Sequence, residues 1–300
     1  RDCLLSRGLG DVYKRQIMIT LRGLFRDLKF LIGCFVYLVK HYSLFSGLKF
    51  QGRQERIVYL LCNGPSLKND METIKKLKGV DFIVVNFMAN DSLFWEIKPQ
   101  YYTLMDPLFF TNRRENRYME RLEVLFDSFN RIDWEMIIFL PIQYEKSFRE
   151  FSKINNPKIK IMVLNTFSSY VASDNVRHFC YRKGYAMPNA QTVAIESIFA
   201  MLNMGYSTIY LYGVDHTFLE GLKVNDKNEL VHVYQHFYEN EPKIIPVTDA
   251  FGYHNSLTKE LQTIVNIFAS HEQCRKYADH LGANIYNLTK GSQIDSYERR

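Results

Sequence analysis

One short stretch of the sequence combines residue types that commonly hold phosphate groups. The apolar run Ile57–Leu61 is long enough for one buried strand, and a helical pattern follows from about Asp70 to Leu77. Between them lies a polar turn made of Asn63, Gly64, Pro65 and Ser66. Glycine permits a tight turn, proline fixes the next φ angle, and Asn and Ser supply short hydrogen-bonding side chains. Such a corner binds phosphate in many α/β sheets, although an ordinary strand-to-helix turn shows the same pattern.

Other polar residues follow the later apolar runs in the same way. Asn86, Asp106, Gly213 and Asp215 each stand at or just after the end of a predicted strand. Ligands of open α/β sheets bind outside the carboxyl ends of the strands, so these residues are expected to share one site. The chain contains neither GxGxxG nor GxxxxGK[ST], and a standard dinucleotide site or P-loop is therefore not expected.

Elements that can position these residues alternate along the chain. Strands are predicted at residues 57–61, 81–86, 101–105, 136–140, 159–164, 208–212 and 284–288. Helices are predicted at residues 70–77, 113–129, 191–204 and 256–280. This alternation predicts an α/β fold with one Rossmann-like, mostly parallel sheet over residues 57–292, followed by a tail at 293–300. The polar, His- and Tyr-rich segment 217–252 is predicted to be an irregular loop or lid beside the site.

Composition narrows the functional classes. The 300 residues are 47% hydrophobic and 23% charged, as expected for a globular protein with a sizeable core. The net charge of +6 is spread along the chain without a Lys/Arg block, so nucleic acid is not an expected partner. The five cysteines show no CxxC or zinc-site spacing, which favours reduced thiols and a cytoplasmic location.

The N-terminal region differs from the rest. Residues 1–16 resemble translated sequencing-adapter sequence, and a native start near Met18 is expected. Residues 17–56 are predicted to form an amphipathic basic helix, up to about Tyr42, and a linker. Its apolar residues keep helical spacing: Leu21, Leu24, Phe25, Leu28, Leu31, Ile32, Phe35, Val36 and Val39. Two interpretations fit this pattern equally: a helix on the inner face of the cell membrane, or a helix packed on the domain.

Five blocks carry a family resemblance. They are residues 62–68, 85–87, 106–110, 205–215 and 282–288. Together they resemble the bacterial sialyltransferases of glycosyltransferase family 42 and a related group. That group includes the motility accessory factors and the archaeal 6-hydroxymethylpterin diphosphokinases. The likeness spans roughly residues 57–292.

The resemblance implies roles for individual residues. The nucleotide of a CMP-linked donor would contact Asn63, Gly64, Ser66 and Asn86, with Gly213 and Asp215 near its ribose and cytosine. Pro65 belongs to the same turn, and Gln191 and Thr192 are the nearest polar candidates before the helix at 191–204. His254 occupies the place of the family's general base, a task that suits an imidazole. In place of two family tyrosines, the chain offers His216, Lys223, Tyr234 or Tyr238 to stabilise the leaving phosphate.

Asp106 keeps an alternative open. The sialyltransferases have Asn-Pro where this chain has Asp106-Pro107, as in the related group. With Asp215, this carboxylate could hold Mg²⁺ on a nucleoside triphosphate, as a diphosphokinase requires. His216, His232 and His236 lack a zinc-site pattern and are interpreted as structural or lid residues. Because the chain has no Asp-x-Asp pair, the transferase interpretation requires no metal or other cofactor.

The leading prediction is a glycosyltransferase that uses a nucleotide-activated sugar, with a CMP-linked acidic sugar as donor. Its acceptor would be a glycan or a lipid-linked glycan in surface-glycan or lipopolysaccharide assembly. The enzyme is expected in the cytoplasm or at the inner membrane face, and a homo-oligomer stays open. The alternatives are a Mg²⁺-dependent diphosphokinase and a catalytically silent nucleotide-binding scaffold.

Overall fold

A parallel sheet forms the centre of the molecule. The computed structural model describes residues 2–111, 118–234, 243–248 and 253–300. Its eight-stranded sheet has the order β11-β10-β6-β1-β2-β3-β4-β5, and every pairing among the described residues is parallel. The strands are β1 (Gln54–Leu61), β2 (Asp81–Val85), β3 (Tyr101–Thr103), β4 (Met136–Pro141), β5 (Ile159–Leu164), β6 (Tyr206–Tyr212), β10 (Asn284–Asn287) and β11 (Glu298–Arg299). The predicted α/β, Rossmann-like fold is confirmed.

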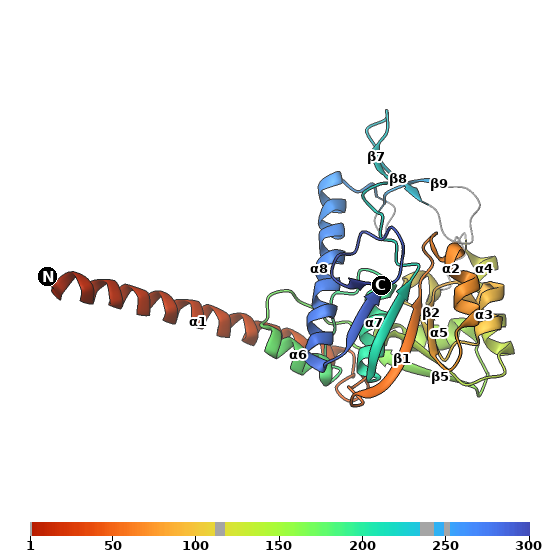
Figure 1. The fold of residues 1–300 in the computed structure, drawn as a ribbon, viewed down its shortest axis with the longest axis horizontal. Coiled ribbons are helices and arrows are strands. Elements are labelled where there is room, and N and C mark those ends of the chain that lie inside the picture. The colour runs from red at the N-terminus through yellow and green to blue at the C-terminus, as the bar shows by residue number, and fades with distance from the viewer. Residues whose placement is uncertain (1, 112–117, 235–242, 249–252) are drawn as a thin grey trace.

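Helices cover both faces of this sheet (Figure 1). One face carries α2 (Leu67–Lys76), α3 (Ser92–Ile97), α4 (Met119–Arg131) and α5 (Glu145–Ser152). The other carries α1 (Asp2–Lys40), α6 (Asp174–Arg182), α7 (Val193–Asn203) and α8 (Leu257–Leu281). Short 3₁₀ turns lie at Met88–Asn90, Pro107–Phe109 and Ile142–Tyr144. Strands covered on both faces read as continuous apolar runs, which explains why β1 and β4 were recognisable in the sequence.

Helix α7 lies deepest in the fold. Residues 194–203 are all buried, and most of them are apolar. It packs against β1, β2, β3 and β6. Because a helix that precedes a parallel strand runs opposite to it, the N-terminus of α7 lies at the carboxyl ends of the strands. The first turn of α7 therefore faces the predicted site.

One segment is more ordered than the sequence indicates. The described part of 217–252 was predicted to be irregular, and this is wrong. It forms a second sheet of β7 (Leu222–Val224), β8 (Leu230–Tyr234) and β9 (Lys243–Pro246), antiparallel and above the carboxyl ends of the main strands (Figure 1). A hydrogen-bonded turn at Asn225–Asn228 joins β7 to β8, and the β-branched pattern of Leu230–Tyr234 suits a strand.

The boundaries of the main sheet also differ from the prediction. β1 begins at Gln54, inside the predicted linker. In the predicted tail, Ile294 and Tyr297 are buried and β11 pairs with β10. Helix α6 lies in a region where no helix was predicted. These short elements are fixed by packing against the core rather than by their own periodicity.

Helix α1 has two apolar faces. Phe30, Cys34 and Leu38 are 2–3% exposed and pack on the domain. The nine apolar residues from Leu21 to Val39 named above, the outer face, remain 40–77% exposed. The helix leaves the body of the molecule beside α6 (Figure 1). Among the described residues, no helix is long and apolar enough to cross a membrane.

Candidate functional site

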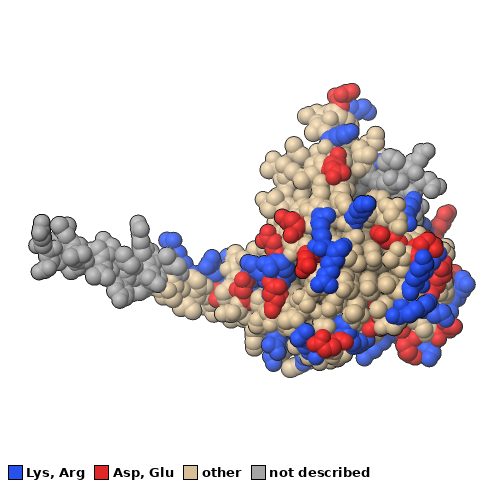
Figure 2. Space-filling model, viewed as in Figure 1, with Lys and Arg blue, Asp and Glu red and all other residues tan. Residues whose placement is uncertain are grey.

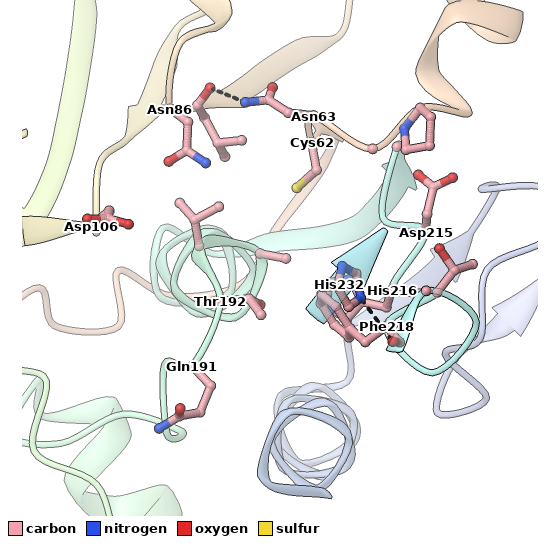
Figure 3. A pocket seen from close by; sticks show the side chains of 18 of the residues that line it. Cys62, Asn63, Asn86, Asp106, Gln191, Thr192, Asp215, His216, Phe218 and His232 are labelled. Atoms are coloured by element: carbon pink, nitrogen blue, oxygen red, sulfur yellow. Dashed lines mark hydrogen bonds between the residues drawn. The ribbon is translucent and has the colours of Figure 1, made fainter. Parts of the chain in front are cut away.

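A cavity of about 770 Å³ lies at the carboxyl ends of β1, β2, β3 and β6. The first turn of α7 forms a second wall, and residues of β7 and β8 form a third. Most of the sequence-predicted site residues line it: Asn63, Gly64, Pro65, Asn86, Asp106, Gln191, Thr192, Gly213, Asp215 and His216 (Figure 3). Ser66 and His254 do not. The volume falls in the range of ordinary ligand pockets.

The cavity coincides with the place where the strand order reverses. From β1 the chain proceeds outward through β2, β3, β4 and β5, whereas β6 pairs with the opposite edge of β1. The turns after β1 and β6 diverge from this point, and an open α/β sheet binds its ligands in the crevice so formed.

Asp215 fixes the turn after β1. Its carboxylate accepts hydrogen bonds from the Ser66 backbone N–H, at 3.2 Å, and from Ser66 Oγ, at 2.9 Å. A Cβ on Gly64 would overlap Asp215 Oδ2 and lie 2.5 Å from the Gly213 carbonyl oxygen, so only glycine fits there. Burial raises the pKa of Asp215, and the bonds from Ser66 oppose that shift. Ser66 therefore does not line the cavity itself, but its hydrogen bonds hold the Asp215 carboxylate in position.

Two further positions need unusual backbone conformations. Gly213 has φ +66°, and a Cβ there would overlap the Cys62 carbonyl oxygen. Asn86 directly follows β2 and has φ +53°, a left-handed conformation that Asn tolerates better than most residues. The hydroxyl of Tyr102 donates to the Asn86 carbonyl, at 2.5 Å, and holds this backbone in place. The cavity floor is thus preformed.

Two buried oxygen atoms in the lining have no partner. Asn63 is 6% exposed, and its Nδ2 donates to the Val85 carbonyl at 3.5 Å, but its Oδ1 accepts no hydrogen bond (Figure 3). Thr192 Oγ1 likewise has no partner. Thr192 is also the N-cap of α7 without a side-chain capping bond, so the first-turn amides of that helix are not capped by it. Unpaired buried polar atoms are uncommon, and a helix N-terminus attracts anions.

The two predicted carboxylates are both engaged locally. Asp106 caps the 3₁₀ turn that follows it, because its Oδ1 accepts from the Leu108 N–H at 2.9 Å. Asp215 is bound to Ser66 as described. Within the described ranges, no three His, Cys, Asp or Glu side chains are grouped closely enough to hold a metal ion. A Mg²⁺ ion on a nucleoside triphosphate takes only one or two protein carboxylates besides the phosphates, so the diphosphokinase remains the alternative that a nucleotide titration has to decide.

Gln191 lies at the cavity beside Thr192, and its side chain is already engaged. Its Nε2 donates to Asn189 Oδ1 at 3.2 Å, and the side chain remains exposed. The cavity lining also contains Glu220 and Phe218, which the sequence did not single out. Both belong to the segment that was predicted as a loop beside the site, and no periodic signal distinguished them from their neighbours.

His216 belongs to a buried chain of hydrogen bonds. Its Nε2 lies 3.0 Å from Nε2 of His271 on α8, and His271 Nδ1 lies 2.9 Å from the Tyr297 hydroxyl. Burial lowers the pKa of His216 to about 3 and holds the pKa of His271 well below its ordinary value. Both rings are therefore neutral at physiological pH. His216 can donate or accept a hydrogen bond, but it supplies no positive charge to a leaving phosphate.

His232 is the histidine that the sequence undervalued. It lies on β8, lines the cavity, and its Nε2 is 3.0 Å from the Phe218 carbonyl (Figure 3). A carbonyl only accepts, so Nε2 carries a proton. Side chains alternate between the two faces of a strand, so position 232 lies on the same face of β8 as positions 230 and 234. Recognising this strand in the sequence would have indicated His232.

His254 lies elsewhere. It forms an isolated β-bridge with Thr248, its side chain is 51% exposed, and its Nε2 is 3.9 Å from a Glu229 oxygen. Lys223, on β7, does line the cavity. Among the described lining residues it is the only Lys or Arg. The Tyr234 side chain and all of His236 and Tyr238 fall outside the described residues.

Comparisons with known proteins were made at three levels. No protein-family model matches the chain, and no curated protein matches it. Solved structures do. A MAf glycosyltransferase from Magnetospirillum magneticum AMB-1 is 15% identical with a TM-score of 0.48, over 85% of this chain and 35% of that one. The chain thus spans about a third of the length of that protein.

Two sialyltransferases from Campylobacter jejuni are also similar. CstII, solved in complex with cytidine-5'-monophosphate described as a substrate analogue, is 13% identical with a TM-score of 0.39, over 83% of this chain and 86% of that one. The monofunctional alpha-2,3-sialyltransferase Cst-I is 16% identical with a TM-score of 0.41, over 83% and 81%. At such scores the chemistry has to be argued from the residues of the cavity.

Proposed function

We propose that this chain is a glycosyltransferase that binds a nucleotide-activated sugar, a CMP-linked acidic sugar, in the cavity. The observation that carries the proposal is the convergence of Asn63 Oδ1, Thr192 Oγ1 and the N-terminus of α7 at the switch point of the sheet. The two oxygen atoms are left without partners in a preformed pocket. A bound nucleotide would satisfy them, with a phosphate at the helix N-terminus.

The leaving group is stabilised without a metal ion in this proposal. When the bond between the anomeric carbon and the phosphate oxygen breaks, negative charge develops on the nucleotide. We propose that the amides of the first turn of α7, the Thr192 hydroxyl and the Lys223 ammonium group, all from the cavity lining, meet this charge. Fixed dipoles of this kind lower a barrier because they need no reorganisation as the charge forms.

His232 is our candidate for the general base. The Phe218 carbonyl orients its ring, and in this proposal Nδ1 accepts the proton of an acceptor hydroxyl, whose oxygen then attacks the anomeric carbon. What supports His232 over His254 is its position in the cavity lining. The acceptor in this proposal is a glycan or lipid-linked glycan of a surface polysaccharide.

The first experiment is a calorimetric titration of the full chain with CMP, UMP, GDP and ATP, each with and without Mg²⁺. We expect CMP to bind most tightly and Mg²⁺ to leave its affinity unchanged. ATP binding that depends on Mg²⁺ would overturn the proposal in favour of the diphosphokinase. CMP binding without turnover of any CMP-sugar would indicate the silent scaffold.

The second experiment compares His232→Asn with the matched variant His254→Asn in a donor-turnover assay. Loss of a general base costs about 10²–10⁴-fold in kcat. We expect that loss for His232→Asn, with CMP affinity retained, and less than about a threefold change for His254→Asn. The reverse result would return the role to His254, and equal small effects would exclude both residues as the base.

A further inference from the structure

The outer face of α1 is a continuous apolar surface that the fold leaves uncovered. At 100° per residue, its nine residues fall within an arc of about 140°. Each is at least 40% exposed, although most of them are large side chains. The exposed aromatic residues Tyr42 and Phe45 extend the surface beyond the end of the helix. Large contiguous apolar patches on a protein surface mark an interaction site.

The opposite face of α1 is firmly attached to the domain. Asp27 accepts hydrogen bonds from the Ser173 N–H, at 2.6 Å, and from Ser173 Oγ, at 2.7 Å. Gly33 lies against Phe167, since a Cβ there would be 3.0 Å from that ring. One side of α1 therefore packs on the domain while the outer face stays exposed, so a partner can bind the outer face without displacing the domain.

Positive charge borders this surface along one edge. Arg22, Arg26, Lys29 and Lys40 occupy the sector of the helix between the outer face and the docked face. Figure 2 shows blue basic atoms along the described part of α1 where it leaves the body. The only acidic residue between positions 17 and 42 is Asp27, which Ser173 already engages. The edge therefore lacks carboxylates of its own.

We propose that α1 binds the surface of an anionic lipid bilayer, with the outer face at the acyl-chain boundary and the basic edge among the headgroups. Anionic headgroups supply the negative charge that this edge lacks. A second copy of the helix would bring only more positive charge, whereas helix pairs are normally joined by opposite charges at such edges. The helix lies on the bilayer rather than across it, because its uncharged run, Phe30–Val39, is too short to span.

Vesicle co-sedimentation of the full chain tests this directly. We expect binding to vesicles of phosphatidylcholine with phosphatidylglycerol, and weak binding to phosphatidylcholine alone. The triple variant Arg22→Gln/Arg26→Gln/Lys29→Gln should bind the anionic vesicles about 100-fold more weakly, since each basic residue near such a surface contributes roughly a fivefold factor. Its matched control neutralises three exposed lysines elsewhere, Lys146→Gln/Lys153→Gln/Lys227→Gln, and should bind as the parent does.

The apolar half of the proposal has its own pair of variants. Leu28→Ser/Phe35→Ser removes two outer-face side chains and should abolish vesicle binding, whereas Ile244→Ser/Val265→Ser changes two equally exposed residues elsewhere and should not. Circular dichroism confirms that all variants are folded. Equal binding to neutral and anionic vesicles would overturn the charge argument. A stable dimer in sedimentation velocity that Leu28→Ser/Phe35→Ser dissociates, without vesicle binding by the parent, would assign the face to a second copy. None of these readouts depends on the proposed enzymatic activity.

Discussion

Two of the three walls of the cavity differ in how firmly the fold holds them. The β1–β6 wall consists of the turn Asn63–Ser66 and the loop 213–215. Besides the bonds from Ser66, two further hydrogen bonds hold that loop, both at 3.0 Å. The Gln293 N–H donates to the Asp215 carbonyl, and the Val214 N–H donates to Thr289 Oγ1. The β7–β9 wall is a small antiparallel sheet in which Val224 and Ile244 are 54% and 71% exposed.

This difference in packing corresponds to a difference in the roles proposed for the two walls. The groups proposed to bind the nucleotide lie on the packed wall or on α7, where the core fixes their positions. The groups proposed to act on the acceptor and the leaving phosphate, His232 and Lys223, lie on the lightly packed wall. Segments with few buried contacts open at low free-energy cost, which suits a wall that must admit one substrate and release another.

Gly64→Ala should produce the largest effect, because the packed wall has no space for a methyl group at this position. The added methyl group overlaps Asp215 Oδ2 and crowds the Gly213 carbonyl, so the turn has to move. We expect the free energy of unfolding to fall by about 3 kcal/mol and nucleotide affinity to fall more than about 100-fold. Urea denaturation and calorimetry measure the two quantities.

A matched glycine variant controls for that result. Gly23→Ala adds the same methyl group where nothing lies within 4 Å, and Gly23 lies inside α1. It should leave nucleotide binding unchanged and not reduce stability. If Gly64→Ala also behaved in this way, the packed wall would be no more rigid than its opposite, and the comparison would fail.

Acid should lower the free energy of unfolding through His216, whose ring is hydrogen-bonded to His271 of α8. Both His216 and His271 are neutral in the fold, with the pKa of His216 lowered to about 3. In the unfolded chain they titrate near pH 6.5, so between pH 6.5 and 3 only the unfolded chain takes up their protons. Stability therefore falls as the pH falls, and His216 alone contributes about 2 kcal/mol of loss at pH 5.

Urea denaturation at pH 7 and pH 5 checks this dependence. In a His216→Gln variant, the loss between the two pH values should be smaller by that amount, because Gln takes up no proton. An unchanged loss would mean that His216 is protonated in the folded protein, contrary to its burial against His271.

Thr192→Val sharpens the comparison with the smallest effect. Valine keeps the shape and removes the unpartnered hydroxyl, so the free energy of unfolding should stay within about 0.5 kcal/mol. Nucleotide affinity should fall about tenfold if the hydroxyl bonds to a phosphate. Ser43→Ala is the control, because Ser43 Oγ is also buried without a partner but does not line the cavity. It should change neither quantity.

Sequence reasoning located the packed wall well. Buried parallel strands have continuous apolar runs, and the polar residues that end them, such as Asn63 and Asn86, are visible against that background. The spacing of Gly213 and Asp215 after β6 was equally clear. Chain order alone indicates that these ends meet, because parallel strands share one carboxyl edge.

The lightly packed wall was not located, for a physical reason. β7 and β9 are short, half exposed and held mainly by their pairing with β8, so no strong apolar alternation reveals them. His254 follows β9, bridges Thr248 and lies outside the cavity lining, which local pattern did not indicate. Local pattern also could not show that Asp215 would bond Ser66, since that contact depends on the completed sheet.

The bonds that fix the Asp215 loop join parts of the chain that are far apart in sequence. Ser66 precedes Asp215 by 149 positions, and Ser292, whose hydroxyl donates to the Val214 carbonyl, follows Val214 by 78. Contacts of such separation pay the largest loop-closure entropy and form late in folding. The cavity floor therefore cannot assemble in a partly folded chain. The appearance of nucleotide binding during refolding would report completion of the whole sheet.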